Sequence, residues 1–331
     1  MGSIISLDKN ITGRLKAVAI ICVIAGHILG GSFGVISPHV QAILGTGGVN
    51  VFLLLSGYGL FVSYNKSATL NLKTYWEAKI NKIFIPYGAI TVFYYGFMYM
   101  IGGAPGLMAL ARNILCIDYS RTIDETMWYM SFLLLWYIIF FCIFYLKYPR
   151  FIKIAIMFAF GYIFNTSMFS NVFLECNWQF STNAYAFPAG VLIAYLIDII
   201  NNISKIRNVV LSRIKYIQCI LFIYGATCFV LGVFQLTEIS YLNYGISYIV
   251  VLYPLFRNFD NNNLFWRWTS NNSFELYLLE AKLISIVSYI GVFNNNWIIW
   301  CIVYVLVTIV SVNIYNFIYS NSMNLIKKYN L

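Results

Sequence analysis

Two ionisable side chains in the first apolar segment are the best candidates for chemistry. Lys16 and His27 lie in the run LKAVAIICVIAGH, eleven positions apart. At about 100° per residue, both side chains project from one helix face, roughly 16 Å apart along the axis. An imidazole inside a bilayer is costly unless it is used or paired, so we expect His27 to act in a reaction. A packed structural histidine and a snorkelling lysine are the alternatives.

A second group of charges lies in a late apolar segment, SNNSFELYLLEAKLI, which contains Glu275, Glu280 and Lys282. Glu275 and Lys282 are seven residues apart and share a helix face, whereas Glu280 points elsewhere. The expected depth of Glu280 in the membrane is close to that of His27. A contact between Glu280 and His27 would orient and polarise the imidazole as a general base.

A third candidate is the basic segment KINKIFIPY, in which Lys79 and Lys82 share one helical face. Two cations there would suit a phosphate-bearing cosubstrate. A cluster that only sets the orientation of the chain explains them equally well.

The composition predicts the elements that must carry these residues. Hydrophobic residues make up 61% of the 331 positions, charged residues make up 10%, and the mean hydropathy is +0.76. A soluble domain has about 25% charged residues. We therefore expect an all-α, polytopic membrane bundle of about ten transmembrane helices. The expected spans are 17–36, 47–64, 83–101, 127–146, 151–170, 184–200, 216–234, 241–256, 272–292 and 297–319.

The basic residues predict the orientation of this bundle. Of the 21 Lys and Arg residues, all but Arg112, Arg121 and Lys282 fall in the segments that are cytoplasmic if the N-terminus is inside. Cytoplasmic loops collect such residues, so we expect both termini in the cytoplasm. The net charge of +10 then needs no nucleic acid as a partner.

The loops and cysteines limit the other classes of site. The connecting loops are too short to fold alone, so residues 1–331 are expected to form a single membrane-embedded domain with no soluble domain attached. The seven cysteines include no CxxC and no Cys/His pair at metal-ligand spacing, so no metal is expected. Cys116 and Cys176 could pair in an oxidising outer compartment, but two free thiols are the simpler expectation.

Two early segments resemble the acyltransferase-3 family of integral membrane acyltransferases. That family has a basic residue, ten residues and then His, and Lys16 to His27 has this spacing with Lys in place of the usual Arg. The family's next segment is similar to G-V-D-x-F-F-x-x-S-G. Here GGVNVFLLLSGYGL matches it, with Asn50 in the Asp position.

Three later segments extend the resemblance in the expected order. Lys79, Lys82 and Pro86 are similar to the family's R-x-x-R-I-x-P segment, and MWYMSFLLLWY at 127–137 is similar to its W-(Y/F)-L segment. SFELYLLE at 273–280 resembles the family's S-x-x-I-Y-L-x-H segment, with Glu280 in place of His. The matches run from about residue 16 to residue 280.

The resemblance implies a multi-pass protein of the plasma or inner membrane. It implies transfer of an acetyl or other acyl group from cytosolic acetyl-CoA to a hydroxyl of a cell-surface polysaccharide or its lipid-linked precursor. His27 would be the general base or acyl relay and Glu280 would support it, while Lys16, Lys79 and Lys82 would hold the donor. The sequence leaves open whether the protein forms a homo-oligomer.

Two other classes of protein share part of this pattern. A transporter of lipid-linked saccharides also has many spans and intramembrane charges, although we find no clear internal repeat. A saccharide polymerase of the membrane would usually carry a large outer loop, and the expected loop 102–126 is moderate in length. Only an acyltransferase depends on an acyl thioester, so dependence on the donor separates the three.

Overall fold

A computed structural model describes residues 7–67, 70–166, 168, 170–236, 239–257, 263–291 and 296–328, without the side chains of 204, 205, 207 and 323–328. Four of the cations used to predict the orientation, Lys205, Arg207, Lys327 and Lys328, thus lie outside the described side chains. The described backbone contains helices and turns and no β-strand, which confirms the all-α class.

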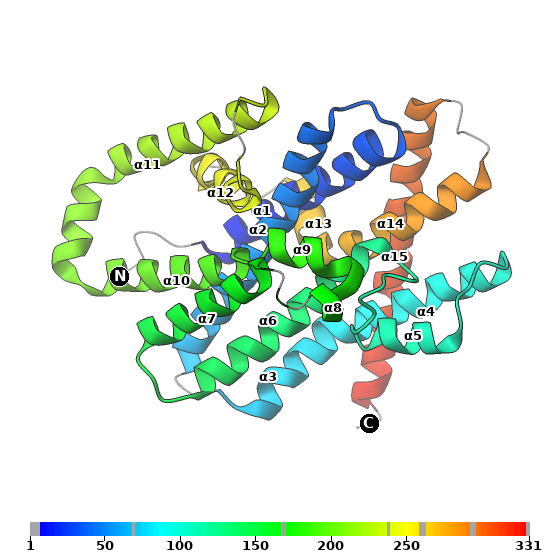
Figure 1. Cartoon of the computed structure of the whole chain (residues 1–331), viewed down its shortest axis with the longest axis horizontal. Coiled ribbons are helices and arrows are strands. Elements are labelled where there is room, and N and C mark those ends of the chain that lie inside the picture. The colour runs from blue at the N-terminus through cyan, green and yellow to red at the C-terminus, as the bar shows by residue number, and fades with distance from the viewer. Residues whose placement is uncertain are drawn as a thin grey trace. The chain divides into compact units, whose positions relative to one another are not determined.

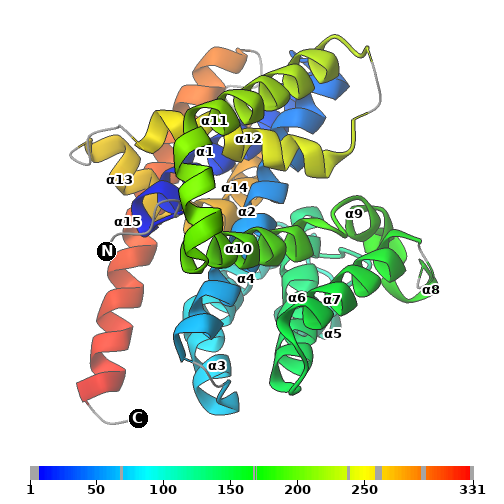
Figure 2. The same ribbon diagram turned by 90° about the vertical axis from the view of Figure 1, so that its left-hand side faces the viewer.

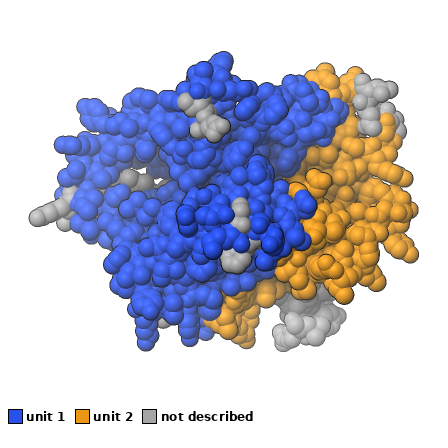
Figure 3. Space-filling model, viewed as in Figure 1, with its two compact units in different colours: residues 1–71, 128–271 blue, residues 72–127, 272–331 orange. Residues whose placement is uncertain are grey.

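The chain divides into two compact units, and each takes two separate stretches of sequence. The first unit comprises residues 1–71 and 128–271, and the second comprises 72–127 and 272–331 (Figure 3). The expectation of a single domain stays a prediction.

The first unit is built around one long helix. Helix α2, at Pro38–Ser67, packs against α1, α10 and α12. The other helices of this unit are α1 (Lys9–Ala25), a π-helix (Gly26–Ser32), α6 (Trp128–Tyr145), α7 (Arg150–Asn165), α8 (Ser170–Phe173), a 3₁₀ turn (Leu174–Cys176), α9 (Asn177–Thr182), α10 (Ala186–Asn202), α11 (Ser204–Val233), α12 (Tyr241–Arg257) and α13 (Leu264–Asn271).

Glycines allow α2 and α10 to approach closely. A Cβ at Gly57 would collide with the carbonyl oxygen of Phe187, and a Cβ at Gly190 would collide with that of Leu54. Because lipid provides no hydrophobic driving force between helices, such close approach stabilises the contact through van der Waals packing. Aromatic side chains also join α6 to α10, where the rings of Trp136 and Phe187 stack with their centres 5.4 Å apart. Helices α6 and α7 lie side by side in both views (Figure 1, Figure 2).

The second unit contains fewer helices. These are α3 (Leu72–Lys79), a π-helix (Ile80–Phe84), α4 (Ile85–Met100), α5 (Leu107–Ile114), a 3₁₀ turn (Glu125–Met127), α14 (Ser273–Ile290) and α15 (Trp297–Lys328). Helix α14 packs against both α4 and α15. It ends at Gly291, whose φ of 72° is a left-handed cap that glycine adopts without strain.

Six helical segments of the described chain are long and apolar enough to cross a membrane. They are Lys9–Ser32, Pro38–Ser67, Leu72–Met100, Glu125–Tyr145, Asn208–Val233 and Trp297–Ser322. A seventh is added if Arg150–Asn165 and Ser170–Thr182, bent by 74° at a break, form one span.

The remaining expected spans are helical, but each is too short or too charged to count by itself as a helix that could cross a membrane. Helices α10 and α12 have 17 residues each, and α12 also contains Pro254. Helix α14 carries Glu275, Glu280 and Lys282 within 18 residues. The total of ten spans and the cytoplasmic position of both termini therefore stay predictions.

Candidate active site

His27 lies at a change of helix type. Asp8 caps α1 by accepting the backbone N–H of Ile11 at 2.8 Å, and the α-helix continues to Ala25. From Gly26 to Ser32 the helix is of the π type, and half-buried His27 is its second residue. π-Helical turns are rare; most of them interrupt an α-helix, and they are frequent at functional sites. The π turn is a feature that the sequence pattern did not predict.

Lys16 lies on α1 in the same continuous helical run and is also half-buried. Its predicted common face with His27 assumed α-helical rotation throughout, whereas the α-helix gives way to the π turn before His27. The structure therefore places both residues in one continuous helical segment, and their common role stays a prediction.

Asn50, the residue in the family's Asp position, is fully buried in α2. Its side-chain N–H groups donate to the side-chain oxygen of Asn183 at 2.6 Å and to the carbonyl oxygen of Thr46 at 3.0 Å. Asn183, which is 1% exposed, lies just before α10 and was not singled out from the sequence. Farther along α2, the Ser56 hydroxyl hydrogen-bonds to Tyr129 and Tyr137 of α6.

Lys79 and Lys82 belong to the second unit and lie just before and within its π-helix Ile80–Phe84. Lys79 is the last residue of α3, and its ammonium lies 3.9 Å from the centre of the Tyr75 ring. Lys82 is exposed within the π-helix Ile80–Phe84. Their predicted common face assumed α-helical rotation, whereas the helix is of the π type from Ile80, so the common face stays a prediction.

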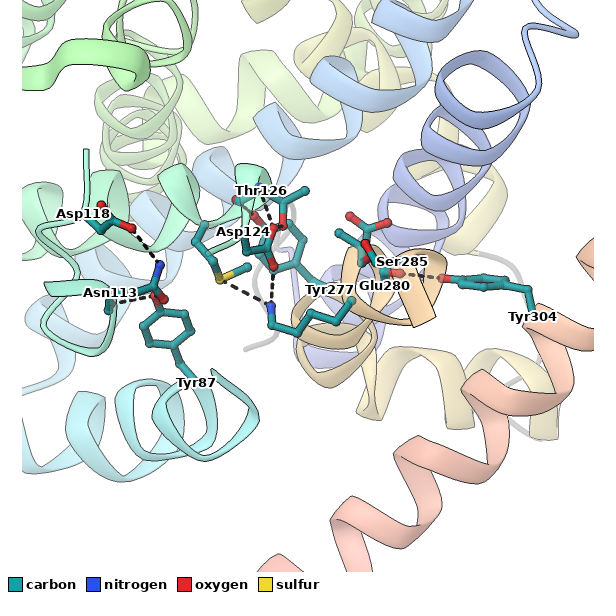
Figure 4. A network of polar contacts seen from close by, with 12 residues as sticks. Tyr87, Asn113, Asp118, Asp124, Thr126, Tyr277, Glu280, Ser285 and Tyr304 are labelled. Atoms are coloured by element: carbon teal, nitrogen blue, oxygen red, sulfur yellow. Dashed lines mark hydrogen bonds and ion pairs between the residues drawn. The ribbon is translucent and has the colours of Figure 1, made fainter. Parts of the chain in front are cut away.

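Glu280 is fully buried on α14, in the second unit. Its backbone carbonyl accepts the hydroxyl of Tyr304, on α15, at 3.4 Å (Figure 4). The predicted contact of Glu280 with His27 stays a prediction.

Lys282 forms a buried ion pair whose partner the sequence did not indicate. Its ammonium lies 2.5 Å from the carboxylate of Asp124, and both side chains are at most 4% exposed. Asp124 also accepts the N–H and hydroxyl of Thr126, at 2.8 and 2.7 Å. Tyr277 then donates to the carbonyl oxygen of Thr126 at 2.7 Å (Figure 4).

The charge balance around Asp124 favours its ionised form. Burial by itself raises the pKa of this carboxyl. The Lys282 ammonium and the Thr126 hydrogen bonds outweigh that effect and hold the pKa below its usual range. We therefore treat Asp124 and Lys282 as a charged pair.

The segment preceding Asp124 is anchored to α4. The side chain of Asn113 accepts the hydroxyl of Tyr87 at 2.7 Å (Figure 4). Asp118 accepts the hydroxyl of Thr122 at 2.7 Å. Asp118 is buried, as is Asp124. These two acids, which the sequence placed in an outer loop, are therefore packed inside the second unit.

The described cysteines and acids were compared with the requirements of a metal site. Among the described residues, no group of three or more His, Cys, Asp or Glu side chains could hold a metal ion. Cys116 and Cys176 form no disulfide and both are buried. Burial raises the pKa of the Cys116 thiol to about 12.

The comparison with protein families covers nearly the whole chain. Residues 13–316 match the acyltransferase-3 family model, which is described as an acyltransferase domain. The chain belongs to this acyltransferase family. The matched residues include all five candidate site residues, and the resemblance found in the motifs is confirmed. No curated protein and no solved structure gives a match.

Membership of the acyltransferase family agrees with the helical structure and with its apolar helices. The protein is thus a multi-pass membrane acyltransferase by family. The candidate residues divide between the units, with His27 and Lys16 in the first and Lys79, Lys82 and Glu280 in the second.

Proposed function

We propose that the protein transfers an acetyl group from cytosolic acetyl-CoA to a hydroxyl of a cell-surface polysaccharide or its lipid-linked precursor, in the cell membrane. The match of residues 13–316 to the acyltransferase family is the observation that carries this proposal. The half-buried imidazole at a π-helical turn supports it, because a general base has to be reachable by its substrate.

In the proposed reaction, His27 takes the proton of the acceptor hydroxyl. The hydroxyl oxygen attacks the thioester carbonyl, a C–O bond forms, and the C–S bond breaks. The proton then passes from His27 to the departing thiolate, so the histidine returns to its neutral state. Lys16 helps to hold the donor, and Glu280 takes the supporting role that a histidine has in the family.

Lys79 and Lys82 serve in this proposal as a site for the coenzyme's phosphates. Lysine binds phosphate as a point charge and does not make the two-pronged hydrogen bonds of arginine. The same difference between lysine and arginine applies to Lys16. We expect Lys16→Arg to retain or raise activity, because arginine is the family's usual residue at that position.

The test is mass spectrometry of surface glycans from cells that carry the intact protein, His27→Ala, His39→Ala or no copy. His39 is the other histidine of the chain and is exposed at the start of α2, so it provides a matched control. We expect an acetyl-sized increment with the intact protein and His39→Ala only, at equal amounts of membrane protein. Acetylation that persists in His27→Ala would contradict the catalytic role of His27.

The same experiment separates the alternative functions. A transporter or polymerase of lipid-linked saccharides would change the amount or length of the glycan and leave the mass of each unit unchanged. Purified protein that consumes no acetyl-CoA in the presence of acceptor would also contradict the acyltransferase proposal.

A further inference from the structure

In the second unit, polar groups from three separate stretches of the chain lie close together: the Glu275 carboxyl acts by charge on Tyr315 and Tyr319, and Tyr319 contacts the backbone of Asn81. Glu275 lies in the first turn of α14, Tyr315 and Tyr319 lie on α15, and Asn81 lies in the π-helix Ile80–Phe84. We refer to these four residues as the Glu275 cluster. None of them belongs to the proposed site residues His27, Lys16, Lys79, Lys82 and Glu280.

Hydrogen bonds and ring stacking hold the cluster in place. The Tyr319 hydroxyl donates to the backbone carbonyl of Asn81 at 2.6 Å. The rings of Tyr315 and Tyr319 stack with centres 5.8 Å apart and planes 16° apart. Beside them, the side chain of Asn316 donates to that of Asn272 at 2.6 Å, which fixes α15 against the start of α14.

The same contacts bring the cluster to the predicted phosphate-binding lysines. Asn81 lies between Lys79 and Lys82 in the sequence, so the bond from Tyr319 ties α15 to the short segment that carries both cations. Lys82 is exposed there.

Two atoms of the cluster are buried without a hydrogen bond. The Oε2 atom of Glu275 and the hydroxyl of Tyr315 have no hydrogen-bond partner among the described residues. One is an acceptor and the other is chiefly a donor. Buried polar atoms are nearly always paired, so two unpaired atoms in one cluster require an explanation.

We propose that the Glu275 cluster binds the nucleotide end of the acyl donor. A nucleotide combines phosphates, a planar base and N–H and O–H donors. Lys79 and Lys82 meet the phosphates, the tyrosine rings offer a stacking surface for the base, and Glu275 accepts a hydrogen bond from an amino or hydroxyl group. The Tyr315 hydroxyl donates to a ring nitrogen or a ribose oxygen. This assignment rests on the proposed function.

The unpaired atoms give a prediction that a purely structural role would not. Tyr315→Phe costs the ligand-free protein no internal hydrogen bond, and Glu275→Ala costs only the bond that the carboxyl accepts from its own backbone N–H, so the unfolding temperature should change little. The loss should appear only in affinity, and hence in the stabilisation that a bound ligand provides.

The experiment measures binding to the full-length protein in lipid nanodiscs. The probes are coenzyme A, adenosine 3′,5′-bisphosphate and 4′-phosphopantetheine, which lacks the nucleotide. The variants are Glu275→Ala and Tyr315→Phe. Their matched controls are Glu77→Ala, an exposed acid on α3, and Tyr289→Phe, an exposed tyrosine near the other end of α14.

We expect Glu275→Ala and Tyr315→Phe each to weaken binding of coenzyme A and of the bisphosphate about tenfold, with phosphopantetheine binding unchanged. The controls should bind like the intact protein. If both variants bind coenzyme A as tightly as the intact protein, this assignment is wrong and the proposed function stands. If the folded, intact protein binds no coenzyme A, the proposed function fails, and this assignment fails with it.

Discussion

Helix α14 carries buried ionisable groups in two contrasting settings. Lys282 is paired with Asp124, and the neighbouring Thr126 and Tyr277 complete a network of hydrogen bonds. Glu275, at the beginning of the same helix, keeps a carboxylate oxygen without a hydrogen-bond partner in the described structure. The protein itself therefore supplies the partner of Lys282, whereas we assign the partner of Glu275 to a bound ligand.

Breaking the ion pair should have the largest effect on stability. Lys282→Met leaves the Asp124 carboxylate buried without its partner, and we expect a loss of about 3–5 kcal/mol in unfolding free energy. Thermal unfolding in detergent measures the change. Lys73→Met, at a lysine whose side chain is 83% exposed, is the control and should have little effect.

The double variant sharpens this result. Asp124→Asn combined with Lys282→Met removes both charges, so part of the lost stability should return. A double variant less stable than Lys282→Met alone would show that the pair is not what stabilises this region.

Acid should weaken the same pair only at low pH. Because the pKa of Asp124 is depressed in the folded state, its contribution is complete above the unfolded pKa of about 3.9 and is lost as pH falls through the lower folded value. The difference in unfolding temperature between the intact protein and Asp124→Asn should be constant from about pH 7 to pH 5 and shrink below about pH 4. A difference that disappears already at pH 6 would contradict the charged pair.

A smaller effect is expected at the edge of the network. Tyr277→Phe removes the hydroxyl that donates to the Thr126 carbonyl and keeps the ring in place. We expect a loss of about 0.5–1.5 kcal/mol in unfolding free energy, measured in the same detergent. Tyr289→Phe, at an exposed position on α14, should leave the stability unchanged.

The smallest change in stability is expected at Glu275. Glu275→Ala removes a charge that favours the N-terminus of α14, which is worth at most about 1 kcal/mol at such a site. A loss as large as that of Lys282→Met would show that Glu275 is also held by the protein, and the contrast between the two ends of α14 would disappear.

The sequence predicted the class of fold and the family well, because both depend on local signals. Apolar runs of helix length and motifs such as Lys16 to His27 can be recognised without knowing which helices pack together. Marginal helices are harder, since the 17-residue α12 and the charged α14 depend on their neighbours for burial.

The partners of the polar residues could not be predicted. Asp124 precedes α6 in the chain and Lys282 lies near the middle of α14, so only the packing of the second unit brings them together. Asn183 is hidden from sequence analysis for the same reason, because its relation to Asn50 arises from the contact of α2 with the segment before α10. The π turns that contain His27 and Lys82 were not predicted either, because the residue pattern was interpreted as α-helical throughout.

The interleaving of the two units has a consequence for synthesis of the protein. Residues 72–127 of the second unit are synthesised before residues 128–271 of the first unit. The other stretch of the second unit, 272–331, is synthesised last. Asp124 is therefore synthesised long before Lys282, and until then it lacks the cation that neutralises it in the folded protein. A chain that ends before α14 thus keeps an acid whose charge is costly to bury without a partner.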